Sequence, residues 1–152
     1  LTLDNEKFSK AIDEKDFDIL VVVCDANPAT NKKPEAYSWV VYDSNDIAIT
    51  IHCKQNISNK EIKGYSFGHI DGTFVFKNKE LYFNLVEELE KNGYSVNLGE
   101  FYVDELVKLA LDKGLRVKSF AAAHYLCFGT PEEYNEICYY YNCIKALRFK
   151  NE

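Results

Sequence analysis

The polar residues best suited to binding chemistry lie where predicted strands end or helices begin. Lys54 follows an apolar strand, and its ammonium group could neutralise a phosphate. Glu100 and Asp104 lie one helical turn apart at a predicted helix start, where the dipole favours carboxylates and both could accept hydrogen bonds from sugar hydroxyls. Gly72 and Thr73 would let a ligand hydroxyl meet backbone and side-chain groups. Ligands collect at the carboxyl ends of strands in open α/β sheets, so these positions are the candidate site.

Each candidate also has a purely structural interpretation. Lys54 suits a solvated loop, acids at a helix start are favoured whatever the function, and a glycine inside a strand often marks a bulge. Composition alone favours the structural interpretation for Lys54, Glu100 and Asp104. For Gly72 and Thr73 the two interpretations are evenly balanced.

The remaining reactive or polar groups give weaker evidence of a functional site. Cys127 lies three residues after His124, but nothing nearby orients this pair as a thiol nucleophile and base, so we expect a packed histidine and a structural thiol. Asp25 is expected to form a turn with Asn27. The five cysteines form no C-x-x-C pair, which is typical of reduced, mostly buried thiols. No Gly-rich phosphate loop is present, so a complete nucleotide site within this chain is not expected.

Hydrophobic periodicity places these residues on a mixture of strands and helices. The alternation of Ile47, Ile49 and Ile51 predicts a strand with one inward side. Thr130, Pro131 and Glu133 form a helix-capping sequence. The predicted strands are 18–24, 37–42, 47–53, 67–76 and 115–121, the predicted helices lie around 8–12 and at 78–93, 100–114 and from 130, and the predicted loops are 26–35 and 56–64.

The order of these elements predicts one α/β domain over 1–152, with a mixed sheet and flanking helices. Hydrophobic residues make up 47% and charged residues 28%, as in a soluble globule. The net charge of -6 and the scattered basic residues argue against nucleic acid as a partner, and no apolar run suits a membrane span. We therefore expect a cytoplasmic protein. The absence of methionine suggests a processed, excised or truncated segment.

Five blocks of the chain resemble the carboxy-terminal half of the sugar-1-phosphate nucleotidyltransferase family. They are YSWVV at 37–41, KQNIS at 54–58, GTF at 72–74, GEFYVD at 99–104 and HYLCFGTPEEY at 124–134. The resemblance implies a mixed sheet of the Rossmann-like, nucleotide-diphospho-sugar transferase type. It also implies a reaction in which a sugar phosphate oxygen attacks the α-phosphorus of a nucleoside triphosphate and releases pyrophosphate, with Mg²⁺ assistance.

By matching position, the resemblance gives Gly72, Thr73 and Glu100 sugar contacts and Lys54 a phosphate contact. The family's metal-binding aspartate corresponds to Ala123, which cannot coordinate a metal. The family's nucleotide-binding loop belongs to an amino-terminal half that this chain lacks. We therefore assign no catalytic residue and no metal ligand within the chain.

Three functions follow from these observations. The first is a truncated or degenerate nucleotidyltransferase-like protein that binds a sugar phosphate or nucleotide sugar, with the missing half on another polypeptide or with a homo-oligomeric assembly. The second is a non-catalytic ligand-binding or protein-interaction module, in which the tyrosines at 139–141 could form an interface, although packing explains such residues more often. The third is a thiol-dependent enzyme built on Cys127 and His124.

Overall fold

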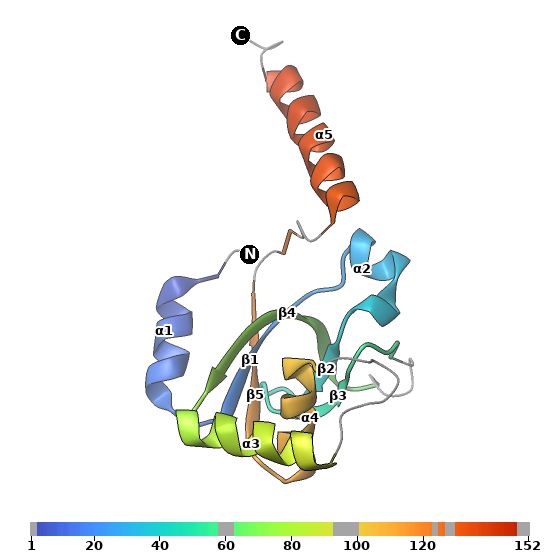
Figure 1. Ribbon diagram of the computed structural model, residues 1–152. Coiled ribbons are helices and arrows are strands. Elements are labelled where there is room, and N and C mark those ends of the chain that lie inside the picture. The colour runs from blue at the N-terminus through green and yellow to red at the C-terminus, as the bar shows by residue number, and fades with distance from the viewer. Residues whose placement is uncertain (1–2, 58–62, 93–100, 123–124, 127–129, 149–152) are drawn as a thin grey trace.

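The computed structural model describes residues 3–57, 63–92, 101–122, 125–126 and 130–148 (Figure 1). Its elements, in chain order, are α1 (Asn5–Glu14), β1 (Ile19–Cys24), α2 (Pro28–Lys32), a 3-10 turn η1 (Pro34–Ala36), β2 (Trp39–Tyr42), β3 (Ala48–His52), β4 (Ser66–Phe76), α3 (Lys79–Asn92), α4 (Val103–Asp112), β5 (Val117–Ala121) and α5 (Pro131–Arg148). The predicted α/β class is confirmed.

The five strands form one mixed sheet in the order β3-β2-β4-β1-β5. β5 is parallel to β1, β4 is antiparallel to both β1 and β2, and β3 is antiparallel to β2. The long strand β4 arches, pairing with β2 along its first part and with β1 along the rest (Figure 1). The sheet curls so far that Ile47, just before β3, forms a bridge with Lys118 of β5.

β1 lies between β4 and β5 in the sheet, and all six of its residues are buried. Ile19, Val21 and Val23 face the main core, which α3 and α4 cover. Val22 and Cys24 face the other side, where Phe8 of α1 packs. Each large apolar side chain buried in this way stabilises the fold by roughly 1.5–3 kcal/mol. The near-continuous apolar run therefore does form a strand that is covered on both faces.

α3 and α4 are placed by local signals as well as by packing. The side chain of Asn78 accepts a hydrogen bond of 2.8 Å from the Leu81 amide and so caps α3, as predicted. After α4 ends, Gly114 takes a φ of 74°, which suits a glycine. Buried leucines of α3 pack against Leu106 and Val107 of α4 in the main core. The start of α4 is thereby held over the sheet.

The prediction of an uninterrupted loop over 26–35 is wrong, because this segment contains α2 and η1. The Asn27 side chain accepts from the Thr30 amide at 3.1 Å, and the Thr30 hydroxyl oxygen accepts from the Asn27 amide at 2.8 Å. This reciprocal pair satisfies the donors at the start of a helix, and Pro28 suits its first position. The polar composition was typical of a loop, but the spacing of Asn27 and Thr30 specifies a helix turn.

The predicted alternation at 47–51 is also wrong in part. Ile51 is buried, but Ile49 is 49% exposed. In the pairing of β2 with β3, Val41 lies opposite Thr50 and Tyr42 lies opposite Ala48, so Ile49 is the extra residue of a bulge. A bulge inserts one residue and turns its side chain away from the regular alternation.

α5 projects away from the body of the fold (Figure 1). Its predicted capping is confirmed, since the Glu133 amide donates to the Thr130 hydroxyl at 3.2 Å and the Thr130 amide donates to the Glu133 carboxylate at 3.1 Å. The expectation that the tyrosines at 139–141 are packed is wrong, because all three are exposed. No helix in the described ranges has the length and apolar character needed to cross a membrane.

Candidate functional site

Ser38, immediately before β2, joins two of the predicted site residues. Its hydroxyl donates a short hydrogen bond to the carboxylate of Asp104, and its oxygen accepts from the Lys54 amide at 3.1 Å. Its carbonyl oxygen also accepts from the Ile70 amide of β4 at 2.8 Å. Ser38 is almost fully buried. The start of β2, the second residue after β3, the middle of β4 and the first turn of α4 therefore meet at one residue, and we call the three residues joined by its hydroxyl the Ser38 node (Ser38, Lys54 and Asp104).

Lys54 is held in a defined position at this node. Its backbone has a φ of 50°, a left-handed conformation that costs a non-glycine residue roughly 1 kcal/mol. Its ammonium donates to the Ala36 carbonyl oxygen at 3.0 Å and lies 5.0 Å from the centroid of the Tyr102 ring. An ammonium carries three donors, so one bond to a carbonyl leaves others for an anion. The geometry thus combines a strained backbone with a placed positive charge.

Asp104 and Glu105 occupy the first turn of α4, and both are buried. The partial positive charge of the helix start favours carboxylates there. Cys53 lies beside them, and burial together with these two carboxylates raises the pKa of its thiol to about 12. Cys53 is therefore a neutral packing residue at neutral pH and not a nucleophile.

Gly72 and Thr73 lie inside β4, as the predicted strand 67–76 has them, so their inclusion among the strand ends is wrong. The pairing with β1 steps from Ile70 opposite Val23 to Phe74 opposite Val21, and the intervening residues form a bulge. Gly72 has a φ of 102°, and the Thr73 amide donates to the Asp71 carboxylate at 2.7 Å. The structural prediction of a bulge at this glycine is confirmed.

The structure therefore brings some of the predicted site residues together. Lys54 and Asp104 meet through Ser38. In the described part of the chain no hydrogen bond joins Thr73 to either of them, although Gly72 lies only two residues from Ile70, which binds Ser38. Glu100, Ala123, His124 and Cys127 lie outside the described residues.

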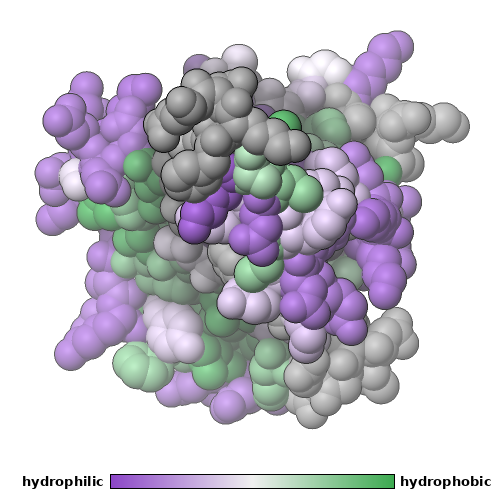
Figure 2. Space-filling view, turned by 90° about the horizontal axis from the view of Figure 1, so that it is seen from above, coloured by the Kyte–Doolittle hydropathy of each residue, from purple (hydrophilic) through white to green (hydrophobic). Residues whose placement is uncertain are grey.

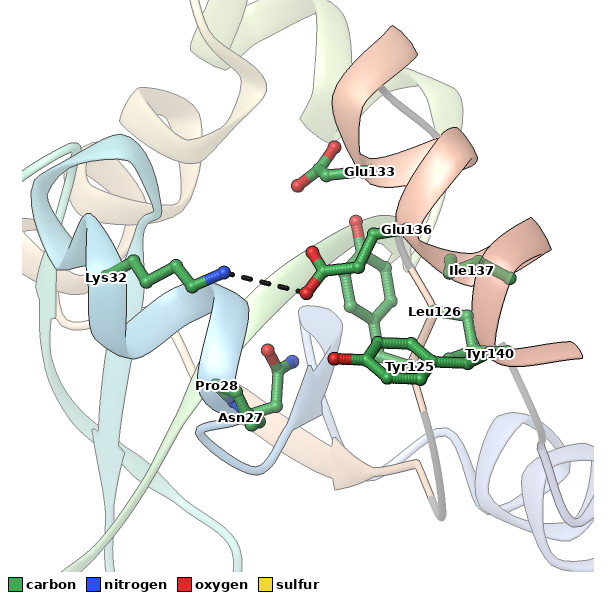
Figure 3. Close-up of a pocket in the computed structure, with 9 residues that line it drawn as sticks. All are labelled: Asn27, Pro28, Lys32, Tyr125, Leu126, Glu133, Glu136, Ile137 and Tyr140. Carbon is green, nitrogen blue, oxygen red and sulfur yellow. Dashed lines mark ion pairs between the residues drawn. The ribbon is translucent and has the colours of Figure 1, made fainter. Parts of the chain in front are cut away.

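A second feature is a hollow of about 190 Å³ beyond the carboxyl ends of the parallel strands β1 and β5 (Figure 3). Asn27 follows β1, and Tyr125 follows β5. The opposite wall comes from α5, with the side chains of Ile137 and Tyr140. Lys32 of α2 reaches across to Glu136 of α5 at 3.7 Å (Figure 3). The hollow combines a mostly apolar lining with a few charged groups, as ligand pockets do.

His69 contacts Tyr125, which lines this hollow, and is completely buried. Its ring makes edge-on contacts with the rings of Tyr37, Trp39 and Tyr125, at centroid distances of 5.4, 5.8 and 5.0 Å. Among the described residues neither ring nitrogen has a hydrogen-bond partner of good geometry. Burial lowers the pKa of His69, although the backbone of Cys24 partly opposes this shift. The histidine is therefore neutral in the folded protein at neutral pH.

Several solved structures share this arrangement of strands. The chain matches CMP-2-keto-3-deoxy-manno-octonic acid synthetase complexed with CTP with a TM-score of 0.53 and 12% identity, over 98% of this chain and 56% of that chain. It matches the nucleoside-diphosphate-sugar pyrophosphorylase from Vibrio cholerae RC9 with a TM-score of 0.51 and 17% identity, over 90% of this chain and 49% of that chain. The chain has the nucleotide-diphospho-sugar transferase fold.

A third solved structure of this fold supports the same conclusion. A Bacillus anthracis protein provisionally assigned as a glucose-1-phosphate thymidylyltransferase, in complex with a sucrose, has a TM-score of 0.54 and 13% identity, over 88% of this chain and 47% of that chain. The chain thus spans about half the length of the solved structures that it matches. No protein-family model and no curated protein matches the sequence.

The resemblance to sugar nucleotidyltransferases implies Mg²⁺, so the described side chains matter here as possible metal ligands. Among the described residues no group of three or more His, Cys, Asp or Glu side chains could hold a metal ion. Asp104, the acid of the node, already accepts from Ser38. The described donors therefore do not form a metal site of their own, and Mg²⁺ stays a prediction.

Sequence reasoning missed three contributors to these sites. Ser38 looked like an ordinary residue within the predicted strand 37–42, and its role depends on distant partners at 54 and 104. Tyr102 precedes α4 and places its ring under the Lys54 ammonium. Tyr125 could have been found, since it comes soon after a predicted strand end at which ligands are expected to collect.

Proposed function

We propose that this chain supplies the sugar-phosphate-facing half of a nucleotidyltransferase-type site. In such a site a phosphate oxygen of a sugar phosphate attacks the α-phosphorus of a nucleoside triphosphate, and pyrophosphate leaves. The nucleotide-facing half would come from another polypeptide segment. The chain alone is expected to bind a sugar phosphate weakly and to release no measurable pyrophosphate.

The Ser38 node is the observation that supports this proposal. It fixes a cation, Lys54, and a carboxylate, Asp104, through one buried hydroxyl, with the amide of one and the carboxylate of the other bonded to the same oxygen. A phosphate needs a positive donor, and sugar hydroxyls need an acceptor. Gly72, Thr73 and Glu100 would extend the sugar-facing wall.

The role of each residue is positional. Lys54 would hold the phosphate and offset its charge, and Ser38 would keep Lys54 and Asp104 in register. If Mg²⁺ takes part, it would be held mainly by substrate phosphates, as this ion commonly is, and would offset charge at phosphorus. The described residues of this chain need only bind and orient the sugar phosphate.

Calorimetric titration of the chain with glucose 1-phosphate, with and without CTP and MgCl₂, tests the proposal. Lys54→Gln should weaken binding by about tenfold or more, because a charge-assisted hydrogen bond contributes about 1.5–3 kcal/mol. Lys79→Gln is the matched control, since Lys79 lies on α3 with its side chain 81% exposed. Equal binding by the Lys54 variant, or no heat at millimolar ligand, would contradict the proposal.

A second candidate is an interaction module without catalysis. It is favoured by α5, whose tyrosines at 139–141 are exposed. Aromatic residues are enriched at protein interfaces, where they bury a large area. The two candidates separate because one predicts ligand binding at the Ser38 node and the other predicts association through α5.

A further inference from the structure

The outer half of α5 is a helix with its apolar side chains in water. Every residue from 139 to 147 is exposed. These residues include Tyr140 at 56%, Ile144 at 55% and Leu147 at 65%. Seen from the side towards which α5 points, apolar and charged side chains lie interspersed at the surface (Figure 2). Large apolar side chains that gather along one exposed helix often belong to an interaction site.

The exposed residues form a stripe with the spacing of a coiled coil. Ile137, Tyr140, Ile144 and Leu147 follow one another at intervals of three, four and three residues, so they share one face of α5. We call these four residues the α5 stripe. Its first half, Ile137 and Tyr140, lines the hollow beside α2, and its second half continues beyond the body of the fold. The stripe is about 15 Å long, given a rise of about 1.5 Å per residue.

The charges of α5 indicate how a partner helix would lie. Glu132, Glu133 and Glu136 occupy its first two turns, whereas Lys145 and Arg148 lie near its end. A second copy of this helix running in the opposite direction places each acidic end beside a basic end. Antiparallel packing also places the opposite ends of the helix dipoles together. A parallel copy would instead place like charges side by side.

We propose that α5 pairs with α5 of a second copy of this chain, as an antiparallel two-helix contact along the α5 stripe. Ile137 then packs opposite Leu147 of the second copy, and Tyr140 packs opposite Ile144. The two-fold axis passes close to Cys143, an exposed free thiol at the edge of the stripe. The contact does not involve the Ser38 node, so this inference is independent of sugar-phosphate binding.

The size of the stripe sets the strength of the contact. It covers about two heptads, fewer than a stable isolated coiled coil uses, and its four residues are far fewer than the roughly 20–30 per partner of a standard interface. The dimer is therefore weak and forms in a concentration-dependent way. The competing occupant is a polypeptide that supplies the other half of the fold, since the solved structures of this fold are about twice as long.

Sedimentation velocity of the full chain under reducing conditions, from about 5 μM to about 500 μM, tests the proposal, since interfaces of this size are weak. The sedimentation coefficient should rise towards that of a dimer across this range. Ile144→Glu combined with Leu147→Glu should weaken association by about tenfold or more, because each glutamate would be buried without a partner. Both positions are exposed in the single chain, so the fold itself should be kept.

Matched variants on the same helix make the test specific. Asn142→Glu changes an exposed residue on the face of α5 opposite the stripe and should leave association unchanged. Mild oxidation should link two copies through Cys143, so Cys143→Ser should abolish the linked dimer and Cys138→Ser should not. A monomer at every concentration, an unaffected double variant, or association only with an added amino-terminal half would overturn the proposal.

Discussion

At the scale of single residues, His69 shows what burial does to a titratable group. Its ring is enclosed by three aromatic rings, and burial disfavours the imidazolium, which lowers its pKa. The backbone of Cys24 acts in the opposite direction but does not cancel the shift. The folded protein therefore binds a proton at this site only at lower pH than the unfolded chain does.

This shift predicts a loss of stability in mild acid. Below the ordinary histidine pKa of about 6.5 the unfolded chain binds a proton at this histidine, whereas the folded chain binds it only at lower pH. The free energy of unfolding should therefore fall as the pH drops below about 6.5, by about 1.4 kcal/mol for each unit of pKa difference, and this fall should end below the folded pKa. Urea denaturation at a series of pH values measures it.

Two variants isolate the His69 contribution from that of the carboxylates. His69→Gln and His69→Phe both remove the titrating ring while changing the packing in different ways. Both should reduce the slope of stability against pH between about pH 6.5 and pH 5. A slope that matches the natural chain in both variants would show that His69 does not titrate between the folded and unfolded states.

At the scale of elements, the sequence predicts best where a few neighbouring residues decide the outcome. The cap of α3 by Asn78 and the box formed by Thr130 and Glu133 depend on side chains that reach their own backbone three residues away. The apolar run of β1 likewise predicts a strand without knowledge of its neighbours. The same logic shows that Asn27 and Thr30 could have been predicted to cap α2.

The bulge at Ile49 and the long-range pairs could not be predicted in this way, although the glycine at 72 did indicate the bulge in β4. Ile49 leaves the alternation because of the register that β3 adopts against β2. Ser38 binds Asp104 over a sequence separation of 66 residues, so no local spacing indicates it. The sequence therefore predicted only part of the Ser38 node. Lys54 and Asp104 were predicted as site residues, but Ser38, which joins them, was not.

Gly72 provides the prediction at this scale, because the bulge in β4 depends on its φ of 102°. Gly72→Ala should destabilise the fold by roughly 1–2 kcal/mol, since a side chain disfavours this backbone conformation. Apart from the adjacent residues, no atom would lie within 4 Å of a Cβ added at Gly72. Backbone strain and not a clash would therefore cause the loss of stability. Chemical denaturation measures the loss.

A comparison with Gly68 separates these two causes. An added Cβ at Gly68 would lie 2.9 Å from the Cys24 carbonyl oxygen, so Gly68→Ala tests close approach between β4 and β1. An unfolding free energy for Gly72→Ala equal to that of the natural chain would show that the bulge adapts to a side chain.

At the scale of the whole molecule, the curled sheet with α1, α3 and α4 is separate from α5. The main core draws its buried residues from β1 to β5, α3 and α4. The contacts of α5 with this body include a hydrogen bond of 3.5 Å from the Tyr37 hydroxyl to Glu133, an ion pair of 3.7 Å between Lys32 and Glu136, and the wall of the hollow, whereas the residues from 139 to 147 are exposed. The chain also spans only about half the length of the solved structures that it matches.

This separation predicts that a chain ending at Gly129 keeps the stability of the body. Exposed ion pairs contribute about 0–1 kcal/mol, so the free energy of unfolding in dilute solution should change by no more than about 1 kcal/mol. The denaturant slope should also stay the same, because it follows the surface that unfolding exposes and the outer half of α5 buries little. A large fall in both quantities on urea denaturation would mean that α5 belongs to the cooperative core. If the shortened chain were less stable than the full chain only at high protein concentration, the difference would come from association of the full chain with a second copy. Such association stabilises the folded state by mass action.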